Sequence, residues 1–154
     1  MKTILAATVI ALALTAHDTP AQTKPNFSGF WKMNGPKSDF GVVPAPALLE
    51  RKITHAEPNL TIVEDQDAGL GVQTTTRTYT TDGKGSTFLS SGAEVKGTAV
   101  WDGSALVVTS AAEIVMLKFV DRMTLSADGK TMTSTIRLSA GQDDLDLKVV
   151  FEKQ

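Results

Sequence analysis

The chain has 154 residues, with 17 acidic and 15 basic side chains, a formal net charge of −2 and no cysteine. A nearly balanced charge without any basic block argues against nucleic acid or an anionic membrane as the main partner. The lack of cysteine excludes disulfide bonds, thiol catalysis and sulfur-ligated metals, so stability has to come from the core and the sheet.

The first residues have the pattern of a secretory signal peptide. A short positive start precedes an apolar run over residues 4–16, which is followed by polar, helix-breaking residues and the small Ala21. We favour cleavage after Ala21 over cleavage after Ala16, which removes residues 1–21 and leaves residues 22–154 as a single β-barrel domain. The apolar run is too short to span a bilayer, and no cysteine at the cleavage site offers a lipid anchor. The sequence therefore predicts an exported protein, periplasmic or secreted, without stable membrane insertion.

The remaining chain has the pattern of β-strands separated by tight turns. Apolar and polar residues alternate in short runs, and no long amphipathic helix interrupts them. This pattern predicts an all-β, antiparallel up-and-down meander of about eight to ten strands that closes into a small barrel, since closure removes the exposed edges. A β-sandwich is the alternative, but its Greek-key crossings need long connections, and the sequence offers one, at 34–50. The expected strands are 27–33, 51–55, 60–64, 72–80, 86–90, 93–101, 104–110, 113–126, 130–138 and 144–152, with the first beside the last.

Three Asp-Gly dipeptides lie between expected strands. Asp-Gly favours a two-residue type I′ turn, in which both central residues have positive φ. Such a turn sets the register of its hairpin, and apolar residues should then meet on one face. The turns Asp82-Gly83, Asp102-Gly103 and Asp128-Gly129 predict, respectively, Arg77 opposite Phe88, Ala99 opposite Leu106, and Leu125 opposite Met132.

The segment 26–41, NFSGFWKMNGPKSDFG, resembles the opening of lipocalin-like, calycin-type barrels. In that superfamily a Gly-x-Trp motif on the first strand, here Gly29 and Trp31, closes one end of an up-and-down barrel that holds a small apolar ligand. A basic residue near the end of the last strand packs over the tryptophan, and Lys153 has the matching parity. The segment also resembles a group of uncharacterised secreted bacterial proteins opening NFSGxWKxNxxKSDFG, which implies the fold and export but no activity.

Inward-facing apolar residues are candidates for holding a ligand. Trp31, Trp101, Leu106 and Phe119 fall on the apolar faces of their strands. Trp31, which shares its face with Phe27, is most simply interpreted as a core plug. Trp101 is interpreted as packing, unless its small neighbours leave room for a ligand.

The strand 72–80 is polar on both faces, and Arg77 and Tyr79 share one of them. If that face points inward, the two side chains would hold the carboxylate of an amphipathic ligand, because apolar pockets carry a few polar groups that orient the ligand. The alternative, which the threonine-rich composition favours, has both side chains in solvent.

His55 is the only histidine after the signal peptide, and its parity is inward. It lies near Arg51 and Glu64, which are expected to form a cross-strand ion pair at a barrel rim. No matching nucleophile or metal-ligand spacing accompanies it, so we interpret it as structural. The acidic run 143–146 lacks the glycine-spaced pattern of a calcium loop. We expect no catalytic residue, no metal and no cofactor.

Two classes of function remain open. A binding module for a small amphipathic or apolar molecule would keep a cavity inside the barrel, with the connection 34–50 as a lid. A structural or surface-interaction protein of the bacterial envelope would have a filled barrel. An enzyme is the third and least supported class, and the pattern leaves the oligomeric state open. The calycin-type opening favours the binding module.

Overall fold

The computed structural model of the chain describes residues 24–90, 92–141 and 143–154, so the predicted signal peptide, residues 1–21, lies outside the described residues. Within these residues ten strands and two short 3-10 turns follow one another, which confirms the all-β class. The predicted segment 113–126 begins with a 3-10 turn and the left-handed Met116 (φ 48°) before its strand starts. The elements are β1 (Gly29–Met33), η1 (Gly35–Lys37), β2 (Leu48–Ala56), β3 (Asn59–Asp67), β4 (Gln73–Thr80), β5 (Ser86–Ser90), β6 (Ala93–Asp102), β7 (Ala105–Ala112), η2 (Glu113–Val115), β8 (Leu117–Leu125), β9 (Thr131–Ala140) and β10 (Asp143–Lys153).

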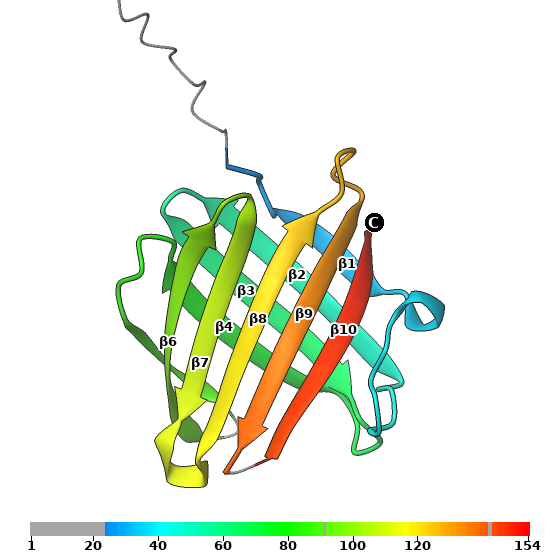
Figure 1. Cartoon of the computed structure of the whole chain (residues 1–154), viewed down its shortest axis with the longest axis vertical. Coiled ribbons are helices and arrows are strands. Elements are labelled where there is room, and N and C mark those ends of the chain that lie inside the picture. The colour runs from blue at the N-terminus through cyan, green and yellow to red at the C-terminus, as the bar shows by residue number, and fades with distance from the viewer. Residues whose placement is uncertain (1–23, 91, 142) are drawn as a thin grey trace, which may run out of the picture.

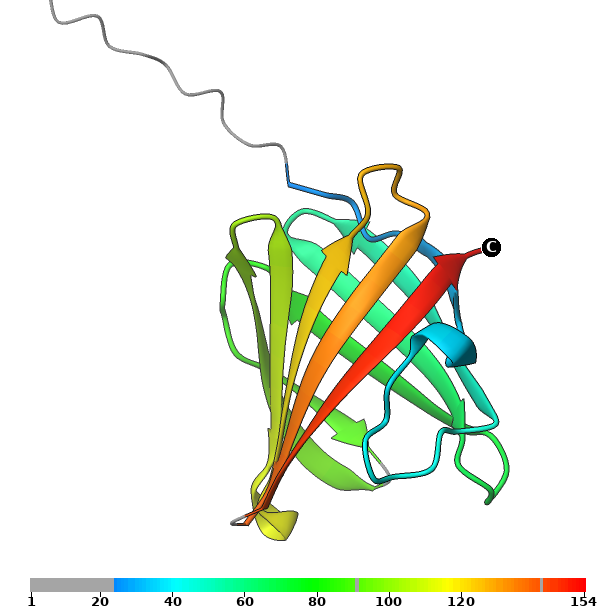
Figure 2. The same ribbon diagram turned by 45° about the vertical axis from the view of Figure 1, so that its right-hand side comes forward.

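All ten strands belong to one antiparallel sheet that curls into a nearly closed barrel (Figures 1 and 2). The hydrogen-bonded order is β4-β3-β2-β1-β10-β9-β8-β7-β6-β5, so the meander is confirmed and the sandwich alternative is wrong. The first strand lies beside the last as predicted, with Trp31 paired to Lys153. That junction is in the middle of the sheet, however, and the two edges that meet to complete the barrel are β4 and β5.

The hairpin between β8 and β9 has the predicted register but a different turn. Leu125 faces Met132 as expected. Ser126 N–H donates to Thr131 O at 2.9 Å, and Gly129 N–H donates to Ser126 O at 2.9 Å, so residues 127–130 form a four-residue loop. Gly129 has φ 68°, whereas Asp128 is not among the described residues with positive φ. The two-residue type I′ turn is therefore wrong, although the need for glycine at this position is real.

The hairpin between β6 and β7 is displaced by two residues from its predicted register. Ala99 pairs with Val108, not with Leu106 as predicted, and Trp101 pairs with Leu106. The cause is the turn, which places Gly103 (φ 61°) first and Ser104 second, an order that suits a type II′ turn. Because the shift is an even number of residues, every side chain stays on its predicted face.

The hairpin predicted at Asp82-Gly83 does not form. Arg77 pairs with Ile62 of β3, and β5 pairs with β6, so Arg77 and Phe88 are not opposite each other in a ladder. After β4, Thr81 N–H donates to Pro58 O and Gly83 N–H donates to Ala99 O. These bonds carry the chain from one edge of the sheet to the other, and they leave a seam between β4 and β5.

One end of the barrel is tightly filled. It contains buried apolar side chains from β1, β2, β3, β6, β7, β8, β9 and β10, and it lies at the end where the turns 57–58 and 103–104 connect their strands. Trp31 Nε1–H donates to Phe27 O at 2.9 Å, which ties the plug to the segment that precedes β1. The fully or nearly fully buried members are Phe27, Trp31, Ile53, Leu60, Ala99, Leu106, Met123, Met132 and Phe151.

Candidate functional site

The other end of the barrel holds a cavity of about 400 Å³, which is within the range of roughly 300–1,000 Å³ for small-molecule sites. Strands alternate in direction, so the β3–β4 connection and η2, which border this cavity, lie at the end opposite the plug (Figure 1). The cavity reaches the seam, because both edge strands contribute to its wall. Its lining residues are Glu64, Gln66, Ala68, Leu70, Gly71, Gln73, Thr75, Arg77, Phe88, Ser90, Val95, Ser110, Ala112, Leu117 and Phe119.

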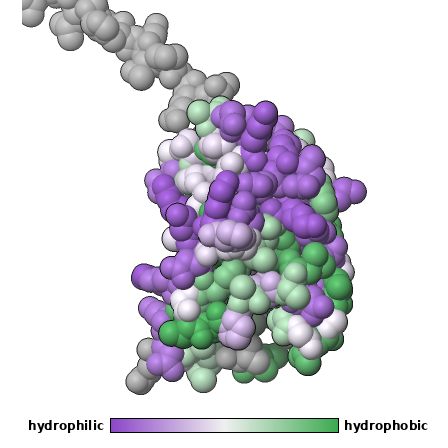
Figure 3. Space-filling view, turned by 90° about the vertical axis from the view of Figure 1, so that its right-hand side faces the viewer, coloured by the Kyte–Doolittle hydropathy of each residue, from purple (hydrophilic) through white to green (hydrophobic). Residues whose placement is uncertain are grey.

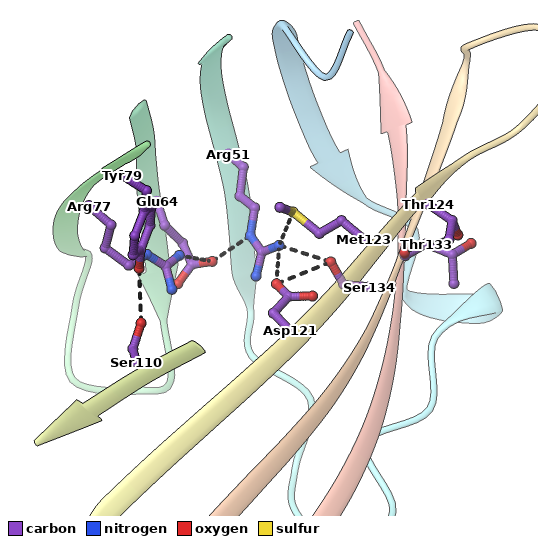
Figure 4. A network of polar contacts seen from close by, with 10 residues as sticks. All are labelled: Arg51, Glu64, Arg77, Tyr79, Ser110, Asp121, Met123, Thr124, Thr133 and Ser134. Carbon is purple, nitrogen blue, oxygen red and sulfur yellow. Dashed lines mark hydrogen bonds and ion pairs between the residues drawn. The ribbon is translucent and has the colours of Figure 1, made fainter. Parts of the chain in front are cut away.

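A cluster of charged side chains separates the cavity from the plug (Figure 4). Arg51 of β2 is at its centre, 1% exposed. Its Nε–H donates to Glu64 Oε2 at 2.6 Å, and its Nη1–H donates to Asp121 Oδ2 at 2.8 Å and to Ser134 Oγ at 2.9 Å. The predicted pair of Arg51 and Glu64 is confirmed, but its placement at a rim is wrong: the curvature of the sheet puts it inside the barrel.

Arg77 and Tyr79 of β4 both point into the barrel, so the alternative that placed them in solvent is wrong. Arg77 Nη2 lies 2.9 Å from Glu64 Oε2, and its guanidinium lies 5.8 Å from the centre of the Phe119 ring. The Tyr79 hydroxyl is hydrogen-bonded to Ser110 Oγ at 2.9 Å. Arg77, Phe119 and Ser110 line the cavity, so this corner of the cluster forms its polar inner wall.

The environment keeps Glu64 and Arg51 of this cluster ionised. Burial by itself would raise the pKa of the Glu64 carboxyl, but the charges of Arg77 and Arg51 and their hydrogen bonds lower it to about 2. Burial likewise opposes the charge of Arg51, and the carboxylates of Glu64 and Asp121 more than offset this, so the pKa of the guanidinium is raised. Burial raises the pKa of the Tyr79 hydroxyl, which keeps its proton for hydrogen bonding.

Comparisons with known proteins find the same fold in several solved structures. No family model and no curated protein sequence matches the chain. Among solved structures, a zebrafish ileal bile acid-binding protein in complex with cholic acid aligns at TM-score 0.61 with 17% identity, over 83% of this chain and 98% of that one. A fatty-acid-binding protein from Echinococcus granulosus aligns at 0.59 with 12% identity, over 82% and 96%. A secretory abundant heat soluble protein from Ramazzottius varieornatus aligns at 0.62 with 12% identity, over 83% and 95%.

The fold shared with these structures is an antiparallel, up-and-down β-barrel. At these identities the likeness shows the fold alone, and the resemblance to the group of secreted bacterial proteins stays a prediction. Within the described residues, no helix has the length and apolar character needed to cross a membrane.

The residues of the calycin-type motif lie together at the plugged end. Lys153 Nζ lies 5.2 Å from the centre of the Trp31 ring. Gly29 has φ 149°, and a Cβ there would lie 2.5 Å from Lys153 Cε. The glycine therefore leaves room for the lysine stem to cross the strand and reach the indole.

The predicted ligand residues divide between the two ends of the barrel. Arg77 and Phe119 line the cavity, and Tyr79 lies one hydrogen bond behind Ser110. Trp31, Trp101 and Leu106 lie at the plugged end and are not among the lining residues. The half-buried Trp101 donates from Nε1–H to Glu57 Oε1 at 2.7 Å, so its indole N–H already has an acceptor within the protein.

Several lining residues were missed from the sequence. Phe88, Val95 and Ser110 occupy inward positions of their strands, so alternation alone could have named them. The β3–β4 connection, which contributes Leu70 and Gly71, has no periodic signal that would place it at a cavity.

His55 has partners on both ring nitrogens. Phe27 N–H donates to Nδ1 at 3.2 Å, and Nε2 lies 3.2 Å from Glu57 Oε1. Burial would raise the pKa of the Glu57 carboxyl, yet hydrogen bonds from Thr81, Trp101 and His55 hold it below its usual value. These contacts join β2 to the segment before β1, which is a structural role. In the part of the chain that the structure describes, no three His, Cys, Asp or Glu side chains come together as a metal site.

Exposed apolar side chains gather at the cavity end of the molecule. Leu70 is 90% exposed and Ile114 is 83% exposed, in the connections that border that end. Figure 3 shows hydrophobic surface concentrated over the lower part of the molecule, with hydrophilic surface above it. The cavity-lining residues include none from the connection 34–50, so its predicted role as a lid stays a prediction. Other exposed apolar residues of the molecule are Phe30, Val42, Val43, Val72, Leu89, Val100 and Met116.

Proposed function

We propose that this protein is an exported barrel that binds one small amphipathic molecule in the cavity beneath the seam. The observation that carries the proposal is the two-part wall of the cavity. Phe88, Val95, Leu117 and Phe119 supply apolar surface, while Arg77 and its partners supply a polar inner end. Small-molecule sites have this composition, mostly apolar with a few polar groups that orient the ligand.

Three further observations support a binding module over a filled barrel. The apolar packing stops at the charged cluster, so the barrel is divided into a plugged half and a hollow half. Solved barrels of the same fold include proteins whose names state that they bind bile acid or fatty acid. The exposed apolar residues at the cavity end, Leu70 among them, would favour the approach of a ligand with a large apolar part.

Binding is tested with Nile red, an uncharged dye whose emission rises in apolar surroundings. We expect saturable emission with the mature protein, and displacement by at least one long-chain lipid. Ala112→Trp projects an indole into the cavity and should abolish the signal. Ala111→Trp, the adjacent residue on the outer face of β7, is the matched control and should leave it intact. The native tryptophans are poorer reporters, because neither lines the cavity.

If no dye or lipid binds, or if both tryptophan variants bind equally, the binding function fails. A structural or surface-interaction protein of the envelope would then take its place.

Export is tested separately by expressing the full chain in a bacterium and sequencing the mature protein from the periplasm or the medium. Cleavage after Ala21 gives an N-terminus at Gln22, and cleavage after Ala16 gives one at His17. A chain that keeps Met1 inside the cell contradicts export.

A further inference from the structure

We infer that the ligand of this cavity has an uncharged head, a hydroxyl or a carbonyl group, on its apolar body; this rests on the proposed binding function. The sequence alone suggested a carboxylate head held by Arg77 and Tyr79. The arrangement of charges around the inner wall favours an uncharged head instead.

The buried charges already balance. The cluster contains two guanidinium groups, Arg51 and Arg77, and two carboxylates, Glu64 and Asp121. Each carboxylate is in contact with a guanidinium: Glu64 lies 2.6 Å from Arg51 and 2.9 Å from Arg77, and Asp121 lies 2.8 Å from Arg51. A carboxylate ligand would add a third negative charge to a buried neutral group, and an uncompensated buried charge is strongly unfavourable.

The nearest cation is already occupied. Arg77 is the guanidinium that lines the cavity, and Glu64, which pairs with it, lines the cavity too. An entering carboxylate that reached Arg77 would therefore lie beside another carboxylate, and like charges in contact repel strongly where water is excluded. The Tyr79 hydroxyl does not relieve this repulsion, because it is engaged with Ser110.

Hydrogen-bonding capacity nevertheless remains on Arg77. Its side chain is 9% exposed, and although Nη2 is in contact with Glu64, the buried Nε has no acceptor among the residues that the structure describes. Its position over the Phe119 ring puts this donor group next to the apolar wall. A hydroxyl or carbonyl oxygen at the inner end would accept from Arg77 without changing the net charge, and a hydroxyl could also donate to Glu64.

The test compares myristyl alcohol with myristic acid, which share their chain length and differ in the head. Displacement of Nile red gives the affinity of each, and the quantity of interest is the ratio of the acid affinity to the alcohol affinity near neutral pH. Glu64→Gln gives the cluster one excess positive charge, and should raise this ratio by at least about tenfold, because a contact repulsion at low dielectric exceeds that factor. Glu50→Gln removes the same charge from the outer face of β2, where Glu50 pairs with Lys32, and should leave the ratio unchanged.

A measurement on the unmodified protein covers the case in which Glu64→Gln does not fold. Calorimetric titrations in two buffers of different ionisation enthalpy report proton uptake. At a pH above the pKa of its carboxyl, myristic acid should take up close to one proton as it binds. Its affinity should therefore fall about tenfold for each unit by which the pH rises. Myristyl alcohol should take up no proton.

Binding of the acid without proton uptake, or an unchanged ratio in Glu64→Gln, overturns the inference and leaves the binding function standing. Failure of both lipids and of Nile red to bind overturns the binding function itself.

Discussion

Tyr79 and Phe88 pack edge to face across the seam of the barrel, with ring centres 5.7 Å apart and planes at 80°. The two residues belong to β4 and β5, the edge strands of the sheet. An aromatic pair in this geometry contributes beyond the burial of its area. Side chains, instead of a backbone ladder between these strands, therefore hold the edges of the barrel together at this point.

Removing a ring from the seam should destabilise the barrel. Phe88→Ala is expected to lower the free energy of unfolding by somewhat less than the about 3–5 kcal/mol of a fully buried phenylalanine, because Phe88 is half-buried. Leu89→Ala, the 70% exposed neighbour on the same strand, is the control and should change little. Urea unfolding measures both, and equal effects would mean that the aromatic pair does not stabilise the seam.

The hydroxyl of Tyr79 should contribute separately from its ring. Tyr79→Phe keeps the contact with Phe88 and removes the hydrogen bond to Ser110, so we expect a loss of about 1 kcal/mol. Urea unfolding of this variant, compared with that of the unmodified protein, gives the difference. No loss would show that water replaces the tyrosine hydroxyl as the partner of Ser110.

Acid should weaken the fold through Glu64. Its pKa in the folded protein, about 2, is below the ordinary value of about 4.3, so the fold favours the ionised carboxylate. This stabilisation is fully present above the ordinary pKa and is lost as the pH falls from about 4.3 toward 2. We expect Glu64→Gln to cost about 3–5 kcal/mol near neutral pH, because it leaves buried guanidinium charge without its partner.

The pH dependence separates Glu64 from the other acidic residues, which also respond to acid. Between about pH 4.3 and 2, the free energy of unfolding should fall less in Glu64→Gln than in the unmodified protein. In Glu50→Gln it should fall by the same amount as in the unmodified protein. Chemical unfolding at a series of pH values supplies the curves. Parallel curves for Glu64→Gln and the unmodified protein would contradict the assignment.

The turn between β8 and β9 depends on a glycine. Gly129 has φ 68°, a conformation that is costly for a branched residue, so Gly129→Val should destabilise by about 1–3 kcal/mol. Gly85→Val is the control, since Gly85 is exposed, has open space around its Cβ position and lacks a positive φ. Thermal unfolding that is the same in both variants would show that the turn rearranges to accept valine.

The contact of Lys153 with Trp31 should be detectable as a cation–π interaction. Lys153→Met keeps an unbranched stem beside the indole and removes the charge, and we expect a loss of about 0.5–1 kcal/mol. Lys148→Met, at an exposed outward position of β10, should have a smaller effect. Thermal unfolding compares the two variants, and equal stability would assign the role of Lys153 to its stem alone.

Much of the fold could be predicted from local patterns. The alternation of Leu147, Val149 and Phe151 with polar residues gives both the strand and its inward face, because successive side chains of a strand point to opposite sides. The turn registers were less certain. Asp128-Gly129 kept the predicted pairing and Asp102-Gly103 moved by two residues, since a glycine with positive φ suits more than one turn geometry.

The candidate site was only partly predictable. Arg77 and Phe119 were named from their positions on strands, and both line the cavity. Trp31 and Trp101 were named for the same reason but lie in the plug, because parity gives the face of a side chain and not its depth along the barrel axis.

The sequence by itself determined the class of the fold, the ten strands and the inward set of side chains, since each depends on neighbours within a few residues. Only the tertiary structure decided which strands become the edges, where the hollow half lies, and that Arg51 meets Asp121, 70 residues away, inside the barrel. The physical reason is that these features arise from the closure of a curved sheet, which brings distant strands together. The position of each inward residue along the barrel axis then decides whether its side chain packs in the plug or lines the cavity.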